Sequence, residues 1–151
     1  MRVLIDADGC PVVDLAIRCA RDQGVEALIL CDAAHVFERE HARTITVMKG
    51  ADSVDFRLVN MIQPGDVAVT QDYGLAAMCL ARGARAINQN GLIYSDDNID
   101  ALLLARYTAR KIRYSGGRLR GPAKRTKAQD AAFRESMERL LSAQRESGER
   151  P

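Results

Sequence analysis

The sequence alternates short apolar runs with longer segments in which apolar residues recur at helical spacing. The short runs cover residues 3–5, 27–31, 44–48, 67–70 and 84–87. This alternation is typical of βαβ units, in which parallel strands form one sheet and helices cover its faces. The pattern therefore predicts an α/β fold with a mainly parallel sheet of five strands.

Local signals mark the ends of the predicted helices. Pro11 opens the first helix, Asp52 can cap the helix that follows the third strand, and Gly83 ends the next one. Asn98 can cap a helix that continues through Arg113. Between these last two helices, residues 88–95 predict a turn and a short extension, which could form a hairpin.

The C-terminal region changes composition. Residues 101–129 contain nine Lys and Arg residues and no acid, so the rest of the chain carries a net negative charge. Within this region, residues 115–127 are rich in glycine and basic residues, which predicts a surface loop because such a stretch cannot build a core. Thr126 and Gln129 then form a capping box for a last helix over residues 127–142, followed by a frayed tail over 143–151.

Length and composition limit the class of protein. A chain of 151 residues suits one domain, which we expect to span residues 1–145. The four cysteines lie far apart and show no zinc-site spacing. No apolar run approaches the ~20 residues that a membrane span needs, and the first residues do not resemble a signal peptide. The sequence therefore predicts a cytoplasmic protein with no membrane segment, and it leaves the oligomeric state open.

Acidic side chains follow two of the predicted strands. Asp6 and Asp8 come after the first strand, and Asp72 comes after the fourth. If the strand order is 3-2-1-4-5, these carboxyl ends are neighbours, and ligands bind at such a reversal of strand order. Asp52 and Asp55, at the start of the helix after the third strand, could overlook the same edge. Asp52 is an equally good helix cap, and Asp8 could also serve as a turn or cap residue.

Several carboxylates at one edge repel one another and call for a compensating cation. Two charges ~4 Å apart cost about 4 kcal/mol at intermediate dielectric. Mg²⁺ and Mn²⁺ prefer oxygen ligands and often share them with substrate phosphate. The acids therefore predict a site for one of these ions.

Five motifs in order carry a family resemblance: "VLIDADGCPV", "KGADSVDF", "GDVAVTQDYGLAAMCLARGA", "NIDALLLAR" and "SGGRLRGPAKRTKAQDAAF". Over residues 1 to about 141 the chain resembles the YaiI/YqxD family of uncharacterised bacterial proteins, whose pattern places it with PIN-like domains. This implies a three-layer sandwich with a Mg²⁺- or Mn²⁺-dependent nuclease centre. By the resemblance, Asp6, Asp72 and either Asp52 or Asp55 bind metal, and Asp8 matches the family's "DAD".

The favoured interpretation is a metal-dependent phosphodiester hydrolase that acts on RNA. Metal ligands would be Asp6, Asp52 or Asp55, and Asp72, with Asp8 orienting the attacking water. A basic arm would grip phosphates with Arg118, Arg120, Lys124, Arg125 and Lys127. The arm could instead be a solvated loop or could contact the acidic body of a neighbouring subunit.

Two alternatives stay open. The first is a non-catalytic RNA- or ribosome-associated binding module that retains the acids as a structural metal site. The second is a haloacid-dehalogenase-like phosphatase, in which Asp6 would be the nucleophile, Asp8 the general acid and Thr70 the phosphate-binding hydroxyl, with metal-binding acids in "YSDD". That scheme needs a lysine between Thr70 and Asp96, and the sequence has none there.

Overall fold

A six-stranded sheet forms the centre of the protein. The computed structural model of the chain describes residues 1–35, 37–48, 53–114 and 124–149. The strands are β1 (Arg2–Asp6), β2 (Glu26–Asp32), β3 (Arg43–Val47), β4 (Val67–Val69), β5 (Arg85–Ile87) and β6 (Ile93–Tyr94). Their order is β3-β2-β1-β4-β5-β6. The first five strands pair in parallel, which confirms the predicted order 3-2-1-4-5.

The sixth strand corrects the prediction of five. Residues 88–92 form a tight turn in which the Asn88 side chain accepts hydrogen bonds from the backbone N–H groups of Asn90 and Leu92, at 2.9 and 2.8 Å. The turn reverses the chain, so β6 pairs antiparallel with β5. The extension expected in this segment is therefore an edge strand of two residues, too short to leave a period-2 pattern in the sequence.

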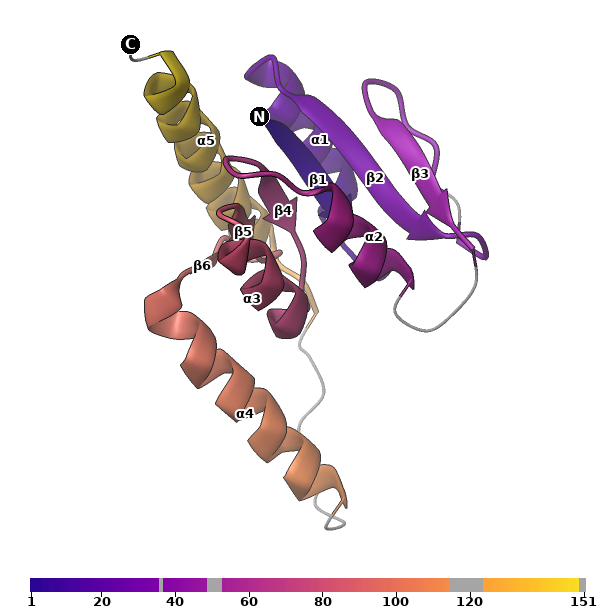
Figure 1. Cartoon of the computed structure of the whole chain (residues 1–151), viewed down its shortest axis with the longest axis vertical. Coiled ribbons are helices and arrows are strands. Elements are labelled where there is room, and N and C mark those ends of the chain that lie inside the picture. The colour runs from indigo at the N-terminus through magenta and orange to yellow at the C-terminus, as the bar shows by residue number, and fades with distance from the viewer. Residues whose placement is uncertain (36, 49–52, 115–123, 150–151) are drawn as a thin grey trace.

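Helices cover both faces of the sheet and make a three-layer α/β sandwich (Figure 1). On one face, the core joins alternate strand residues such as Val3 and Ile5 to α1 (Val13–Asp22) and α5 (Lys127–Glu149). On the other face, Leu4 and its neighbours pack against α2 (Ser53–Met61), α3 (Tyr73–Ala81) and the start of α4 (Asp96–Tyr114). Because both faces are covered, the central strands are apolar throughout.

Two helix starts differ from the predicted ones. The first helix begins at Val13 rather than at Pro11. The fourth begins at Asp96, two positions before the predicted cap. Asn98 instead ties the helix back to the preceding strand, because its amide accepts the Ser95 backbone N–H at 2.9 Å and donates to the Ile93 carbonyl at 3.0 Å.

The last helix begins as predicted. The Thr126 hydroxyl accepts the Gln129 N–H, and the Gln129 side chain accepts the Thr126 N–H, which confirms the capping box. The helix continues past residue 142 to Glu149. Most of the expected basic loop, residues 115–123, lies outside the described residues. The apolar stripe of the helix is buried against the core, through Phe133, Met137, Leu140 and Leu141.

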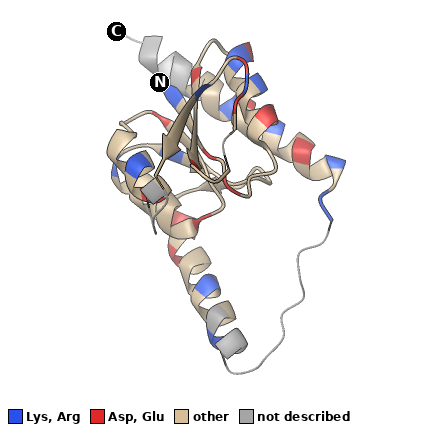
Figure 2. Cartoon of the chain, turned by 90° about the vertical axis from the view of Figure 1, so that its right-hand side faces the viewer, with Lys and Arg blue, Asp and Glu red and all other residues tan. Residues whose placement is uncertain are grey.

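The fourth helix has a different environment from the others. Only its first part packs against the core, where Ile99 is buried. The rest of α4 extends away from the sheet, as two views at right angles show (Figures 1 and 2). Leu104 and Tyr107 on this part are largely exposed. Among the described residues, no helix combines the length and the apolar character needed to cross a membrane.

Candidate active site

An open pocket of about 490 Å³ lies at the carboxyl ends of β1 and β4. Strand order reverses between these two strands, which is the usual ligand site of an open α/β sheet. The pocket is lined by Asp6, Asp8, Gln71, Asp72, Tyr73 and Arg106. The three acids predicted to share one crevice therefore do so. Their catalytic and metal-binding roles stay predictions.

Asp6 ends β1 and is held at the pocket by a neighbouring strand. Thr70 donates a hydrogen bond from its hydroxyl to Asp6 Oδ2, at 2.8 Å. Burial raises the pKa of Asp6 to about 6, and the negative charges of Asp55, Asp72 and Asp8 add to the rise, while the bond from Thr70 opposes it. The ionised form of this carboxylate therefore lacks full compensation within the described part of the chain.

Thr70 connects the two strands that carry the site. Its hydroxyl accepts the backbone N–H of Asp72 at 3.0 Å as well as donating to Asp6. Its carbonyl accepts the buried Tyr94 hydroxyl at 3.1 Å. Thr70 is only 1% exposed, so its geometry is set by the core. It therefore positions Asp6 relative to the start of α3.

Asp72 has two partners. Its Oδ1 accepts the backbone N–H of Leu75 at 3.1 Å, which caps the N-terminus of α3. The same oxygen lies 3.3 Å from a guanidinium nitrogen of Arg106 in α4. Sequence reasoning did not place Arg106 at the site, because 34 positions separate it from Asp72 and no local pattern relates them.

Asp8 lies at the exposed mouth of the pocket. Its Oδ2 accepts the backbone N–H of Asp32 at 3.3 Å, which ties the turn after β1 to the end of β2. Gln71 donates from its side chain to the Gly9 carbonyl at 2.7 Å and so links the same turn to the segment after β4. Asp8 thus stays near the other acids without being buried.

The acids from the second helix are only partly accounted for. Asp52 lies outside the described residues. Asp55, near the start of α2, contributes to the raised pKa of Asp6 and also lines a second pocket. Among the described side chains, no group of three His, Cys, Asp or Glu residues is arranged to hold a metal ion. The donor type nevertheless fits Mg²⁺ or Mn²⁺, since all the nearby acids offer carboxylate oxygens.

The cysteines near the site do not supply a nucleophile. Burial raises the pKa of Cys10 to about 11, and that of Cys79 to about 12 with help from the charges of Asp6 and Asp55. Both thiols are therefore protonated at neutral pH, and thiolate chemistry is unfavourable here.

Three of the five predicted phosphate-binding residues lie within the described part of the chain. Arg118 and Arg120 lie outside the described residues, and Lys124 is exposed. Lys127 lines a pocket of about 410 Å³ between α1 and α5, together with Arg18 and Arg134. That pocket also contains Asp14 and Asp130, so its charge is mixed.

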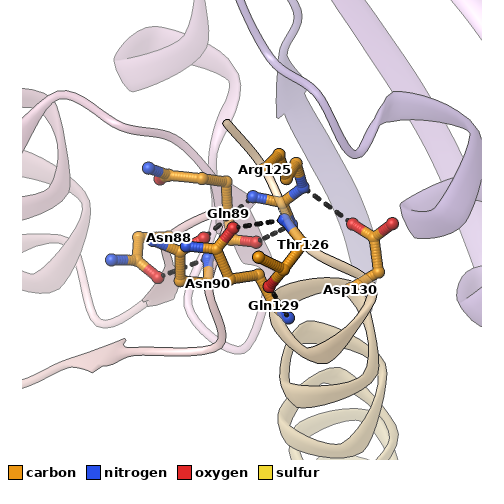
Figure 3. Close-up of polar contacts among 7 residues, drawn as sticks. All are labelled: Asn88, Gln89, Asn90, Arg125, Thr126, Gln129 and Asp130. Carbon is orange, nitrogen blue, oxygen red and sulfur yellow. Dashed lines mark hydrogen bonds and ion pairs between the residues drawn. The ribbon is translucent and has the colours of Figure 1, made fainter. Parts of the chain in front are cut away.

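Arg125 holds two parts of the fold together (Figure 3). Its guanidinium donates to Asp130 in α5 at 2.7 Å, to the Asn90 side chain at 2.8 Å and to the Gln89 carbonyl at 2.5 Å. It therefore fastens the turn before β6 to the start of α5. This gives Arg125 a structural role, and its contact with nucleic acid stays a prediction.

The geometry bears on the phosphatase alternative in two ways. Thr70 does lie against Asp6, as that scheme expects. Asp96 and Asp97, its metal-binding acids, are exposed at the start of α4 and are not among the residues that line the pocket. The pocket is therefore lined by the proposed nucleophile and general acid of that scheme and not by its metal-binding acids.

Comparisons with known proteins agree on the family. Residues 4–143 match the model of the family described as "Uncharacterized BCR, YaiI/YqxD family". A UPF0178 protein of Exiguobacterium sibiricum is 54% identical over 142 residues, covering 94% of this chain and 97% of the relative. A UPF0178 protein of Ruminiclostridium cellulolyticum is 48% identical over 137 residues, covering 91% and 90%.

Among solved structures, a mutant of Rae1 (YacP) from Bacillus subtilis is similar with a TM-score of 0.42 and 14% identity, covering 95% of this chain and 99% of that one. A likeness of this strength carries no argument about fold or activity. The sequence matches are far stronger and extend over nearly the whole chain. The protein therefore belongs to the YaiI/YqxD family.

Proposed function

We propose that this protein is a Mg²⁺- or Mn²⁺-dependent phosphodiesterase that cleaves nucleic acid, RNA rather than DNA. The observation that carries the proposal is the pocket in which Asp6, with its raised pKa, meets Asp8, Asp72 and the guanidinium of Arg106. An open pocket that combines mutually repelling carboxylates with a guanidinium suits a metal ion and an anionic substrate.

Asp6, Asp72 and either Asp52 or Asp55 would hold the ion through carboxylate oxygens. When bound, Mg²⁺ or Mn²⁺ would polarise the scissile phosphodiester and lower the pKa of an attacking water. Occupation of the site would also relieve the repulsion that Asp55, Asp72 and Asp8 exert on Asp6.

The remaining residues have separate tasks. Asp8, exposed at the mouth, would orient the attacking water and accept its proton. Arg106 would contact a phosphate oxygen, and its present partner is the Asp72 carboxylate. Thr70 would keep Asp6 in place through its 2.8 Å hydrogen bond.

The choice of RNA rests on the resemblance of the motifs to PIN-like domains. Lys124 and Lys127, with Arg118 and Arg120, would neutralise backbone phosphates, so binding would weaken as salt rises. Arg125 would act by fastening the start of α5, from which Lys127 projects.

The decisive experiment compares two neutralised acids. The full chain with Mn²⁺ is incubated with labelled single-stranded RNA, structured RNA and DNA of the same sequence. Asp6→Asn should lower the cleavage rate at least about 100-fold, because it removes the central carboxylate. Asp22→Asn, a matched change at the exposed end of α1, should leave the rate unchanged. Cleavage that survives Asp6→Asn or metal chelation would overturn the proposal.

One observation favours the second candidate, a nucleic-acid-binding module without catalysis. Asp72 already has structural uses, because it caps α3 and pairs with Arg106. The same experiment separates the two functions. Salt-dependent RNA binding with no cleavage in any metal would support the binding module.

A further inference from the structure

A second pocket lies beside the acidic site, in the groove between α2 and α3. It has a volume of about 290 Å³ and a mainly apolar lining. These helices lie side by side on one face of the sheet (Figure 1). The lining residues are Asp55, Phe56, Val59, Asn60, Met78 and Arg82.

Asp55 joins this groove to the acidic site. It lines the groove, and its negative charge is also the largest acidic contribution to the raised pKa of Asp6. Asp55 lies in the first turn of α2, which follows the carboxyl end of β3, so it stands at the same edge of the parallel sheet as the acidic pocket. The groove therefore starts at the edge of the sheet that carries the acids and extends along α2.

The groove exposes apolar groups that a folded chain usually buries. Phe56 is 66% exposed and Met78 is 45% exposed. The other two phenylalanines, Phe37 and Phe133, are partly and fully buried. An exposed aromatic beside a thioether, rimmed by polar groups, is typical of a binding surface.

We propose that this groove binds a nucleobase of the single-stranded nucleic acid whose phosphodiester occupies the acidic pocket. The base would stack on the Phe56 ring and contact Met78, because every base has an apolar face that suits an aromatic side chain. Asn60 and Arg82 at the rim would meet its polar edge or the adjoining phosphate. This inference rests on the proposed function, since it names a subsite for the same substrate.

The dimensions agree with this occupant. From Asp55 to Asn60, α2 rises about 7.5 Å at ~1.5 Å per residue. That length accommodates one or two bases stacked at ~3.4 Å. The length of the groove is thus matched to one or two nucleotides of the bound strand.

The test measures binding without cleavage. A labelled nine-nucleotide single-stranded RNA is titrated with the full chain in Ca²⁺, in place of Mg²⁺ or Mn²⁺. Phe56→Ala should raise the dissociation constant roughly 5- to 150-fold, the range expected for the loss of one stacked base. Phe56→Tyr keeps the ring and should bind as the parent does. Leu104→Ala, which truncates an apolar side chain of similar exposure on α4, should change affinity little.

A second series locates the base. Oligonucleotides with a single abasic position are titrated with the parent chain and with Phe56→Ala. When the abasic position is the one that occupies the groove, the oligonucleotide should bind the parent chain more weakly. The parent and Phe56→Ala should then have nearly the same affinity for it. That loss of additivity is specific to a direct contact.

Three outcomes would overturn the inference. The first is equal affinity of the parent and Phe56→Ala. The second is full affinity with Phe56→Leu, which keeps apolar contact but removes the ring. The third is an oligomeric state, measured by sedimentation, that changes with Phe56→Ala while RNA affinity does not, because the occupant would then be a second copy. Binding that depends on Phe56 without any cleavage would contradict the catalytic proposal and leave this subsite standing.

Discussion

The two ends of the central strands carry acids in opposite situations. At the amino end, Asp66 precedes β4 and is 3% exposed. Its carboxylate pairs with the Arg2 guanidinium at 2.9 Å and accepts the backbone N–H groups of Arg2 and Gln63, both at 2.9 Å. At the carboxyl end, Asp6 accepts one hydrogen bond, from Thr70, and faces three further negative charges.

Asp66 therefore stabilises the folded state, whereas the ionised form of Asp6 destabilises it. Asp66 is surrounded by hydrogen-bond donors, and its ion pair and hydrogen bonds hold the start of β1 to the turn before β4. Burial and three nearby acids disfavour the charge of Asp6, and the hydrogen bond from Thr70 opposes them only in part. An uncompensated acid of this kind is typical of a functional site, where stability is given up for binding or catalysis.

The largest expected effect on stability comes from removing Asp66, the acid at the amino end of the strands. Asp66→Ala leaves two backbone N–H groups without their acceptor and removes the carboxylate partner of the Arg2 guanidinium, which keeps the Met61 carbonyl at 2.6 Å. Because an ion pair with a nearly buried carboxylate is lost and two backbone N–H groups are left unsatisfied, the free energy of unfolding should fall by about 3–5 kcal/mol, as measured by urea denaturation. Replacing Arg2 and Asp66 together with apolar residues should recover part of this loss. A change below about 1 kcal/mol for Asp66→Ala would contradict the comparison.

The second effect has the opposite sign and depends on pH. In metal-free buffer, Asp6→Asn should raise the free energy of unfolding at pH 7 by on the order of 2 kcal/mol. The pKa of Asp6 rises from 3.8 to about 6 on folding, so the native state binds more protons between these values. The stability of the parent chain should therefore fall as pH rises through this window, and the two proteins should converge below pH ~4.

Metal provides the control for this second prediction. Mn²⁺ at ~100 times its dissociation constant should stabilise the parent by about 2.7 kcal/mol, by mass action. The Asp6→Asn chain should gain much less. If both gain equally, the ion binds elsewhere; if Asp6→Asn is less stable than the parent at pH 7 without metal, the strain assigned to Asp6 is absent.

The smallest effect is expected from Arg106→Gln. In this pair the Arg106 side chain is 40% exposed and the Asp72 side chain 33% exposed, so its loss should change the free energy of unfolding by less than about 1 kcal/mol. RNA affinity should fall more, since this is the cation that lines the acidic pocket. Thermal denaturation and RNA titration on the same samples compare the two effects. A large loss of stability with unchanged affinity would assign Arg106 to the fold instead.

The sheet and its acidic edge were predictable because both depend on local patterns. The runs that form β1, β2 and β4 are continuous and apolar, as buried parallel strands require. Asp6 ends one such run and Asp72 comes three positions after another, so the strand order alone was enough to bring them together. The capping box at Thr126 is equally local.

The features that escaped prediction depend on residues far apart in the chain. The ion pair of Asp66 with Arg2 joins residues that are 64 positions apart. Arg106 joins the acidic pocket only through the docking of α4 on α3. The groove lined by Phe56 and Met78 exists only once α2 and α3 pack together. No spacing rule relates such pairs, so tertiary structure was needed to find them.

The position of α5 has a consequence for how the protein is made. One face of the sheet, with α1, is completed by Phe133, Met137, Leu140 and Leu141. On a ribosome, this half of the core must wait until residues 127–141 have been synthesised and released, while apolar side chains of α1 remain uncovered. Chaperone dependence during translation should therefore be concentrated on this face, and the face covered by α2 and α3 can close earlier.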